Sequence, residues 1–230
     1  MLSGARADQL TIADGGTLSV AGGVSGAVAA VTDSGKTQTA FYETLARAVD
    51  AAGDGADVSI IKAGDHTLPA KAISNITIAG VDGTVMTCEH SDAEGSNKYT
   101  NVTIENVKFA KSRWNASFTG ENRIENCTFA AENEYAFRYA YVVAGGSLSI
   151  EDCVFDEDCE VYVHYNAASN VTVTLTGCSV SDGSAVKDIC YEYEYYYSGA
   201  DKVEEPSNRG WKLLVDNEKY DTGSGLKNKF

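Results

Sequence analysis

Proline and basic residues are scarce in this chain of 230 residues, and each scarcity excludes a class of protein. Two prolines are too few for a proline-rich linker, whereas 22 glycines suit many tight turns. Lys and Arg total 18 against 33 Asp and Glu, which gives a formal net charge of -15. A molecule with this charge repels phosphates, so we expect no nucleic-acid partner.

Long apolar runs are also missing from the sequence. No segment approaches the length of a membrane span, and the first residues contain no apolar run of signal-peptide length. We therefore expect no membrane insertion, and one domain is the default for a chain of this length.

An internal repeat is the main feature that the sequence does contain. Five segments share the pattern of a β-branched or other apolar residue, any residue, Ile or Leu, any residue, and then Asn, Asp or Gly. Their last apolar residues are Ile78, Ile104, Ile124, Ile150 and Leu175. The spacings of 26, 20, 26 and 25 residues are too long for a meander of hairpins and are typical of a solenoid built from short strands.

A second apolar ladder follows the first at a constant offset. Its members are Phe109, Phe129, Phe155 and Val180. Because side chains alternate across a strand, both sets are expected to point into the interior. Asn106, Asn126 and Asp152 lie between the two strands, where Asn and Asp tolerate left-handed backbone geometry, and so predict an asparagine ladder at a corner.

Six cysteines invite a disulfide framework, but the repeat favours another interpretation. Cys127, Cys153 and Cys178 occupy one inward position on successive turns, where they are expected to be reduced thiols packed as small apolar groups. A bridge between Cys153 and Cys159 stays open. No Cys-x-x-Cys pair or His partner is present, so we expect no zinc.

The stacked runs at 101–104 and 126–129, with the entry segment 44–53 and the strand at 58–64, carry a resemblance. Residues 40 to 198 resemble the right-handed parallel β-helix proteins of the pectate-lyase-like superfamily. The likeness is greatest to the non-catalytic β-helix regions of bacterial secreted and cell-surface proteins. It implies an all-β fold, a right-handed parallel β-helix with a capping α-helix near residues 40–52. It also implies an extracellular or cell-surface location, with leader and anchor outside this chain.

The layout expected within this single structural domain has four parts: N-terminal strands or cap at 1–36, capping helix at 37–55, β-helix coils at 56–198, and C-terminal hairpin or cap at 199–230. The capping helix also has its own evidence, because apolar residues from Phe41 to Ala52 fall on one helical face. We expect Thr39 to cap its start and Gly53 its end.

The two ends of the chain leave one question open and settle another. Strands around Leu10–Ile12 and Thr17–Val20 either extend the stack or cross its end. At the other end, Asp216-Asn217 predicts a hairpin that closes the stack.

No catalytic or metal-binding residue is predicted. The resemblance implies that lyases of this fold use calcium held by carboxylates, with an Arg or Lys base, and that its hydrolases use paired carboxylates. No such motif stands out here. We expect no cofactor, with calcium involved only if the protein is a lyase.

The candidate ligand-binding residues lie in an aromatic region at matching offsets on successive turns. They are Trp114, Arg138, Tyr139, Tyr141, Tyr162, His164 and Tyr193. Arg138 and His164 differ by 26 residues, about one turn, and are expected at equivalent positions. Exposed tyrosines near Arg or His are typical of sugar or protein recognition, and tyrosines that merely pack on one another are the equal alternative.

Three functions are consistent with these features. The favoured one is a non-catalytic exported bacterial surface module, adhesin-like or a stalk, that presents a β-helix side face to glycans or to host or cell-surface proteins. The alternative is a carbohydrate-active enzyme, a polysaccharide lyase, glycoside hydrolase or depolymerase, possibly of phage-tail type. A row of Thr77, Thr103, Ser149 and Thr174 suggests ice binding, but Arg123 interrupts it.

Overall fold

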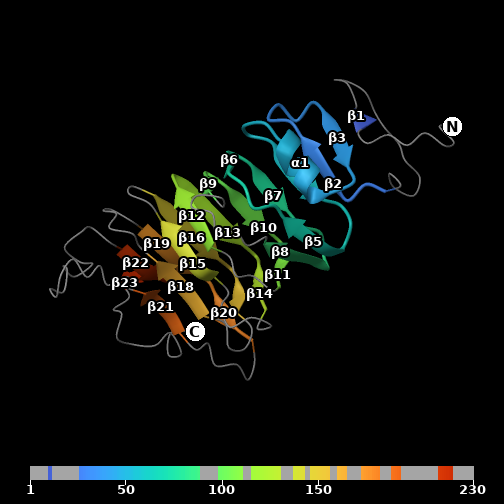
Figure 1. Cartoon of the computed structure of the whole chain (residues 1–230). Coiled ribbons are helices and arrows are strands. Elements are labelled where there is room, and N and C mark those ends of the chain that lie inside the picture. Colours follow the sequence, from blue (N-terminus) through green and yellow to red (C-terminus); the bar gives the residue numbers. More distant parts are fainter. Residues whose placement is uncertain are drawn as a thin grey trace.

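The computed structural model is an elongated stack of short strands that runs from the N-terminal end to the C-terminal end of the chain (Figure 1). The structure describes residues 10–11, 26–88, 98–110, 115–130, 137–142, 146–155, 160–164, 172–181, 188–192 and 212–219. Within them, no helix is long and apolar enough to span a membrane.

Three sheets form the sides of the stack, and each coil of the chain contributes one strand to each sheet. Sheet A contains the parallel strands β4 (Asp57–Ile60), β7 (Thr77–Ala79), β10 (Thr103–Glu105), β13 (Glu121–Glu125), β16 (Ser147–Glu151), β19 (Thr172–Thr176) and β22 (Lys212–Val215). Sheet B contains β5 (Gly64–Leu68), β8 (Thr84–Cys88), β11 (Lys108–Phe109), β14 (Thr128–Phe129), β17 (Val154–Phe155) and β20 (Ser179–Val180). Sheet C contains β6 (Ile73–Ser74), β9 (Lys98–Thr100), β12 (Asn115–Thr119), β15 (Phe137–Val142), β18 (Glu160–His164) and β21 (Asp188–Glu192).

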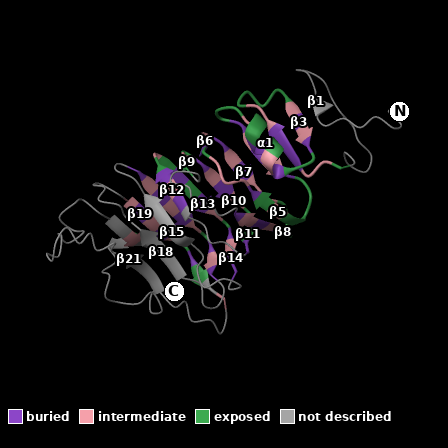
Figure 2. Ribbon diagram, in the orientation of Figure 1, coloured by how far each residue is buried: buried purple, intermediate pink, exposed green. Residues whose placement is uncertain are grey.

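Parallel pairing between successive coils confirms the predicted β-solenoid. Ile78, Ile104, Ile124, Ile150 and Leu175 are Cα partners in sequence along sheet A, although one coil is shorter than the others. All five side chains are buried, with at most 2% of their surface exposed. Figure 2 shows the buried residues running along the inside of the stack. The right-handed sense of the coils stays a prediction.

Sheet B supplies an aromatic column to the same core. The Phe109 and Phe129 rings stack with centroids 5.0 Å apart, and Phe129 stacks on Phe155 at 5.1 Å. Met86 precedes Phe109 in this column as its Cα partner. The predicted inward phenylalanines are thus confirmed, while the side chain of Val180 lies outside the described part of the structure.

The corner between sheets A and B has the predicted left-handed backbone. Asn106, Asn126 and Asp152 have φ values of 59°, 50° and 50°, and Gly177 continues the series at 62°. Each side chain is exposed. The corner ladder is therefore confirmed, and it ends in the residue type that adopts this backbone without steric cost.

A second left-handed corner connects sheet C to sheet A. Asn75 and Asn101 have φ values of 54° and 53°, and Asn101 Nδ2 donates to Asn75 Oδ1 at 2.9 Å. The next member is Gly120, at φ 69°, where a Cβ atom would lie 2.2 Å from Asn101 Oδ1. A glycine is required here because the side chain of the coil before it fills the space.

The N-terminal strands extend sheet A in the antiparallel direction, which answers the open question about that end. β2 (Ala29–Thr32) pairs with β4 and with β3 (Thr39–Tyr42), and β1 (Leu10–Thr11) adds to β3. The predicted strand at 17–20 lies outside the described residues.

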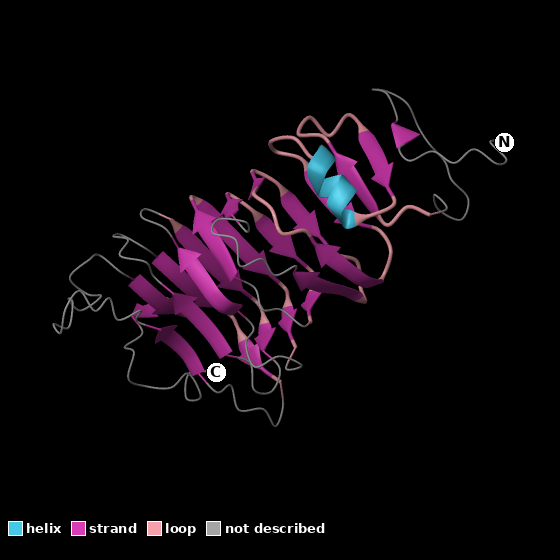
Figure 3. Cartoon of the chain, in the orientation of Figure 1, coloured by secondary structure: helices cyan, strands magenta, loops and turns pink. Residues whose placement is uncertain are grey.

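The capping helix α1 spans only Leu45–Ala51, and it packs at the N-terminal end of the stack (Figure 3). Its N-cap is Thr44, whose hydroxyl accepts from the Arg47 amide at 3.2 Å, and its C-cap is Ala52. The predictions that the helix begins near residue 40 and that Thr39 and Gly53 cap it were wrong. Residues 39–42 alternate between partly and fully buried side chains, and pairing with β2 makes them a strand instead.

The predicted C-terminal hairpin is present. β22 pairs with β19 in parallel and with β23 (Glu218–Lys219) in the antiparallel direction. The two turn residues, Asp216 and Asn217, have φ values of 47° and 67°, as a tight hairpin turn requires. Asp216 Oδ1 also accepts from the Gly177 amide at 3.0 Å, which ties the hairpin to the corner ladder.

We predict that Phe129→Ala lowers the free energy of unfolding by about 3–5 kcal/mol, because it removes a buried ring that stacks on two others. Chemical denaturation measures this change. Thr128→Ala, at the partly exposed neighbouring position, is the control and is expected to alter stability by less than about 0.5 kcal/mol. A loss of under about 1 kcal/mol for Phe129→Ala would contradict a packed aromatic column.

Candidate functional site

The predicted ligand-binding residues concentrate on sheet C. The backbones of Arg138, Tyr139 and Tyr141 lie in β15, and those of Tyr162 and His164 lie in β18. Trp114 and Tyr193, the remaining two, lie outside the described residues.

Strand pairing arranges one continuous row across sheet C, which we call the sheet C row. Its members are successive Cα partners on β9, β12, β15, β18 and β21: Lys98, Ser117, Tyr141, His164 and Glu192. The prediction that Arg138 and His164 occupy equivalent positions was wrong. The register between β15 and β18 shifts between Phe137 and Ala140, so Tyr141 is the partner of His164.

The first two strands of the row show which positions face outward. Lys98 is exposed and Ser117 is partly exposed, whereas their neighbours Tyr99 and Phe118 are 1% and 2% exposed. The Tyr99 and Phe118 rings stack inside, with centroids 5.7 Å apart. The sheet C row therefore continues, in register, the outward positions of β9 and β12.

Sheet A carries a different outer face. The row proposed for ice binding is in register as expected, with Arg123 between Thr103 and Ser149. The adjacent row contains Glu105, Glu125 and Glu151 as successive partners. Arg123 Nη2 lies 3.2 Å from Glu125 Oε2 and 2.5 Å from Glu151 Oε2, so it offsets the repulsion between two of these stacked carboxylates.

The cysteine ladder lies inside the stack, as predicted. Cys127, Cys153 and Cys178 are buried free thiols, and Cys88 is a fourth. Cys127 Sγ donates to the Glu125 carbonyl at 3.1 Å, and Cys153 Sγ donates to the Glu151 carbonyl at 3.2 Å. The proposed bridge partner Cys159 lies outside the described residues.

Contacts between neighbouring thiols change their acidity in opposite directions. A hydrogen bond from Cys153 lowers the pKa of Cys127, because it favours the Cys127 thiolate. That same hydrogen bond raises the pKa of Cys153 to about 12. The pKa of Cys178 is raised by its hydrogen bond with Cys153 and then by burial. Burial alone raises the pKa of Cys88.

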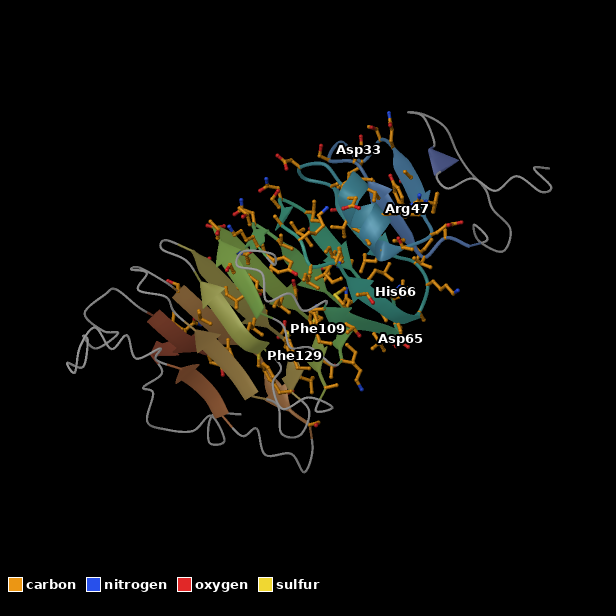
Figure 4. The ribbon with its side chains drawn as sticks, in the orientation of Figure 1. Asp33, Arg47, Asp65, His66, Phe109 and Phe129 are labelled. Atoms are coloured by element: carbon orange, nitrogen blue, oxygen red, sulfur yellow. The ribbon has the colours of Figure 1, made fainter. Side chains whose placement is uncertain are left out.

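Two hollows open on the described surface. The first, which we call the cap hollow, has a volume of about 470 Å³ and lies between the start of α1 and β5. Its lining includes Val28, Glu43, Leu45, Lys62, Asp65 and His66. His66 and Asp65 lie on β5 near the helix that carries Arg47 (Figure 4).

The second hollow, the corner hollow, has a volume of about 530 Å³ and follows the corner between sheets A and B. Asp82, Lys108, Asn126 and Thr128 are among its lining residues. Thr84 also lines it, and the buried Thr84 Oγ1 has no hydrogen-bond partner.

Sequence reasoning missed the cap hollow, because His66 reads as an isolated histidine. Aligning residues 64–68 with 84–88 is the signal that finds it, since this alignment puts His66 at an inward position opposite Met86. Across the described part of the chain, no group of three or more His, Cys, Asp or Glu side chains is arranged to hold a metal ion.

Comparisons with known proteins return no match: no family model, no curated protein sequence and no solved structure is similar to this chain.

The raised pKa of Cys153 predicts a stability that falls at alkaline pH. In the unfolded chain this thiol ionises near its ordinary pKa of 9.0, whereas in the folded chain it ionises near about 12. Its contribution is complete below pH 9.0 and is lost as pH rises toward about 12, because the unfolded state then binds fewer protons. Unfolding curves across this range are expected to be less steep in pH for Cys153→Ala. Equal pH dependence in the two proteins would argue against a buried neutral thiol.

Proposed function

We propose that this protein is a non-catalytic exported surface module that uses the sheet C side of its β-solenoid to bind glycans. The observation that carries the proposal is the sheet C row, in which Tyr141 and His164 are adjacent members between Lys98 at one end and Glu192 at the other. Extracellular or cell-surface location is part of the same proposal.

Glycan binding fits the chemistry of this row. A tyrosine offers a flat apolar surface and a hydroxyl, which suit the apolar face and the hydroxyls of a sugar ring. Lysine donates hydrogen bonds, glutamate accepts them, and neutral histidine does both. Because adjacent strands are about 4.8 Å apart, successive members are spaced to contact one or two sugar units.

The neighbouring aromatic positions add to the proposed face. Tyr139 is the partner of Asn115, and Tyr162 is the partner of Cys190. Arg138 lies in the same irregular part of β15. By contrast, the outer face of sheet A carries mainly Thr, Ser and paired charges, so sheet C is the side that we favour for recognition.

Right-handed coils and kinship with the pectate-lyase-like β-helix proteins belong to the proposal. The two apolar ladders and the left-handed Asn corner support the kinship. The general preference of parallel crossovers for the right-handed sense supports the handedness.

A glycan array tests the proposal with wild-type protein and the double variant Tyr141→Ala/His164→Ala. We expect wild type to bind a defined set of glycans and the double variant to lose at least about tenfold in affinity, the size typical of a central aromatic contact. The control Thr103→Ala/Ser149→Ala changes two outward positions on sheet A and is expected to bind like wild type.

Two results would overturn this function. Equal binding by wild type and the sheet C variant would remove the sheet C row from recognition. Shortening of a bound glycan by wild-type protein, with or without calcium, would replace the non-catalytic module by the carbohydrate-active enzyme.

A further inference from the structure

The core column in sheet B changes character at the N-terminal end of the stack. His66, Met86, Phe109, Phe129 and Phe155 are successive Cα partners. The last four side chains are at most 1% exposed, whereas His66 is partly exposed and lines the cap hollow. An inward position that is apolar in the coils below is therefore an imidazole where the column opens to solvent.

The shortness of the cap helix accounts for this opening. Because residues 39–42 form β3, α1 begins only at Leu45 and covers part of the end of the stack. The space between its first turn and β5 has a volume of about 470 Å³, within the range of small-molecule sites. Val28 and Leu45 supply apolar lining, and both are at least partly buried.

Hydrogen bonding determines which atom His66 offers to this space. His66 Nε2 lies 2.6 Å from the Lys62 carbonyl oxygen, which only accepts hydrogen bonds. In the neutral ring Nε2 therefore carries the proton, and Nδ1 is left as an acceptor. The contact also fixes the orientation of the ring on β5.

The charged lining is richer in acceptors than in donors. Glu43 and Asp65 are exposed carboxylates, and Lys62 is the cation among the charged residues named for this hollow. Together with neutral His66 they give the lining an excess of negative charge, on a chain whose formal net charge is already -15. Such a lining favours a ligand that has several O–H or N–H donors and repels an anion.

We propose that the cap hollow is a second binding site, specific for one neutral or cationic sugar unit. The apolar lining contacts one face of the ring, while Glu43, Asp65 and His66 Nδ1 accept hydrogen bonds from its hydroxyl or amino groups. The site lies on α1 and sheet B, so it does not rest on the function proposed for sheet C.

Titration with three monosaccharides tests this site: D-glucosamine, D-glucose and D-glucuronate, each followed by amide chemical shifts in NMR spectra. We expect saturable shifts at residues 62–67 with glucosamine and glucose. Dissociation constants on the order of 1 mM suit ligands of this size. Glucuronate is expected to bind at least tenfold more weakly than glucosamine.

Variants of the lining separate charge from shape. Glu43→Gln/Asp65→Asn is expected to bring the affinities for glucosamine and glucuronate to within about threefold, because it removes charge while preserving shape. Ala46→Phe fills the hollow from α1 and is expected to abolish the shifts for all three sugars. Glu105→Gln, the same change on sheet A, is the matched control and leaves the wild-type preference unchanged.

Three outcomes would overturn the second site. They are no saturable shift at residues 62–67 with any of the sugars, equal affinity of wild type for glucosamine and glucuronate, and an unchanged preference in Glu43→Gln/Asp65→Asn. Tyr141→Ala/His164→Ala is expected to keep the shifts at the cap hollow, so failure of either site is visible separately.

Discussion

Each coil of this protein stacks on the next in strict register, and every other feature depends on that pairing. A parallel strand presents the same residue number, offset by one coil, at the same place in the sheet, so inward positions become columns of like residues. The isoleucine, phenylalanine and cysteine columns fill the interior without a separate packing solution for each coil. The same register lines up the outward residues, which is why sheet C has a row suited to recognition and sheet A has stacked carboxylates.

Two corners maintain this register against variation elsewhere. Asn, Asp or Gly with positive φ turns the chain at the same point in successive coils, and amide side chains link one coil to another. The spacing between inward isoleucines falls to 20 residues in one coil and is 25 or 26 in the others, yet the Cα partners do not change. The difference is therefore absorbed outside the paired strands. A module of this kind is able to vary its side faces while keeping its core, which suits the proposed function in ligand presentation.

The repeat predicted the solenoid, both apolar ladders, the thiol ladder and one corner, because these properties follow from alternation and spacing. The helix start was mispredicted because Phe41 fits a helical face as well as a strand, and only pairing with β2 decides between them. Arg138 was set opposite His164 for a similar reason: counting residues does not reveal a local irregularity in β15. His66 escaped notice because its significance comes from its position above Met86 and from the short helix beside it, and neither is visible in local sequence.

The in-register stack is tested most directly by a distance between residues far apart in sequence. Ser59 and Thr176 are outward positions connected through Ala79, Glu105, Glu125 and Glu151, five strand spacings in sheet A. Spin labels attached there through unnatural residues, which leave the native thiols untouched, are expected to give a narrow distribution of distances centred at about 24 Å, because each spacing is about 4.8 Å. A broad distribution, or one centred well above this distance, would contradict the stacked coils.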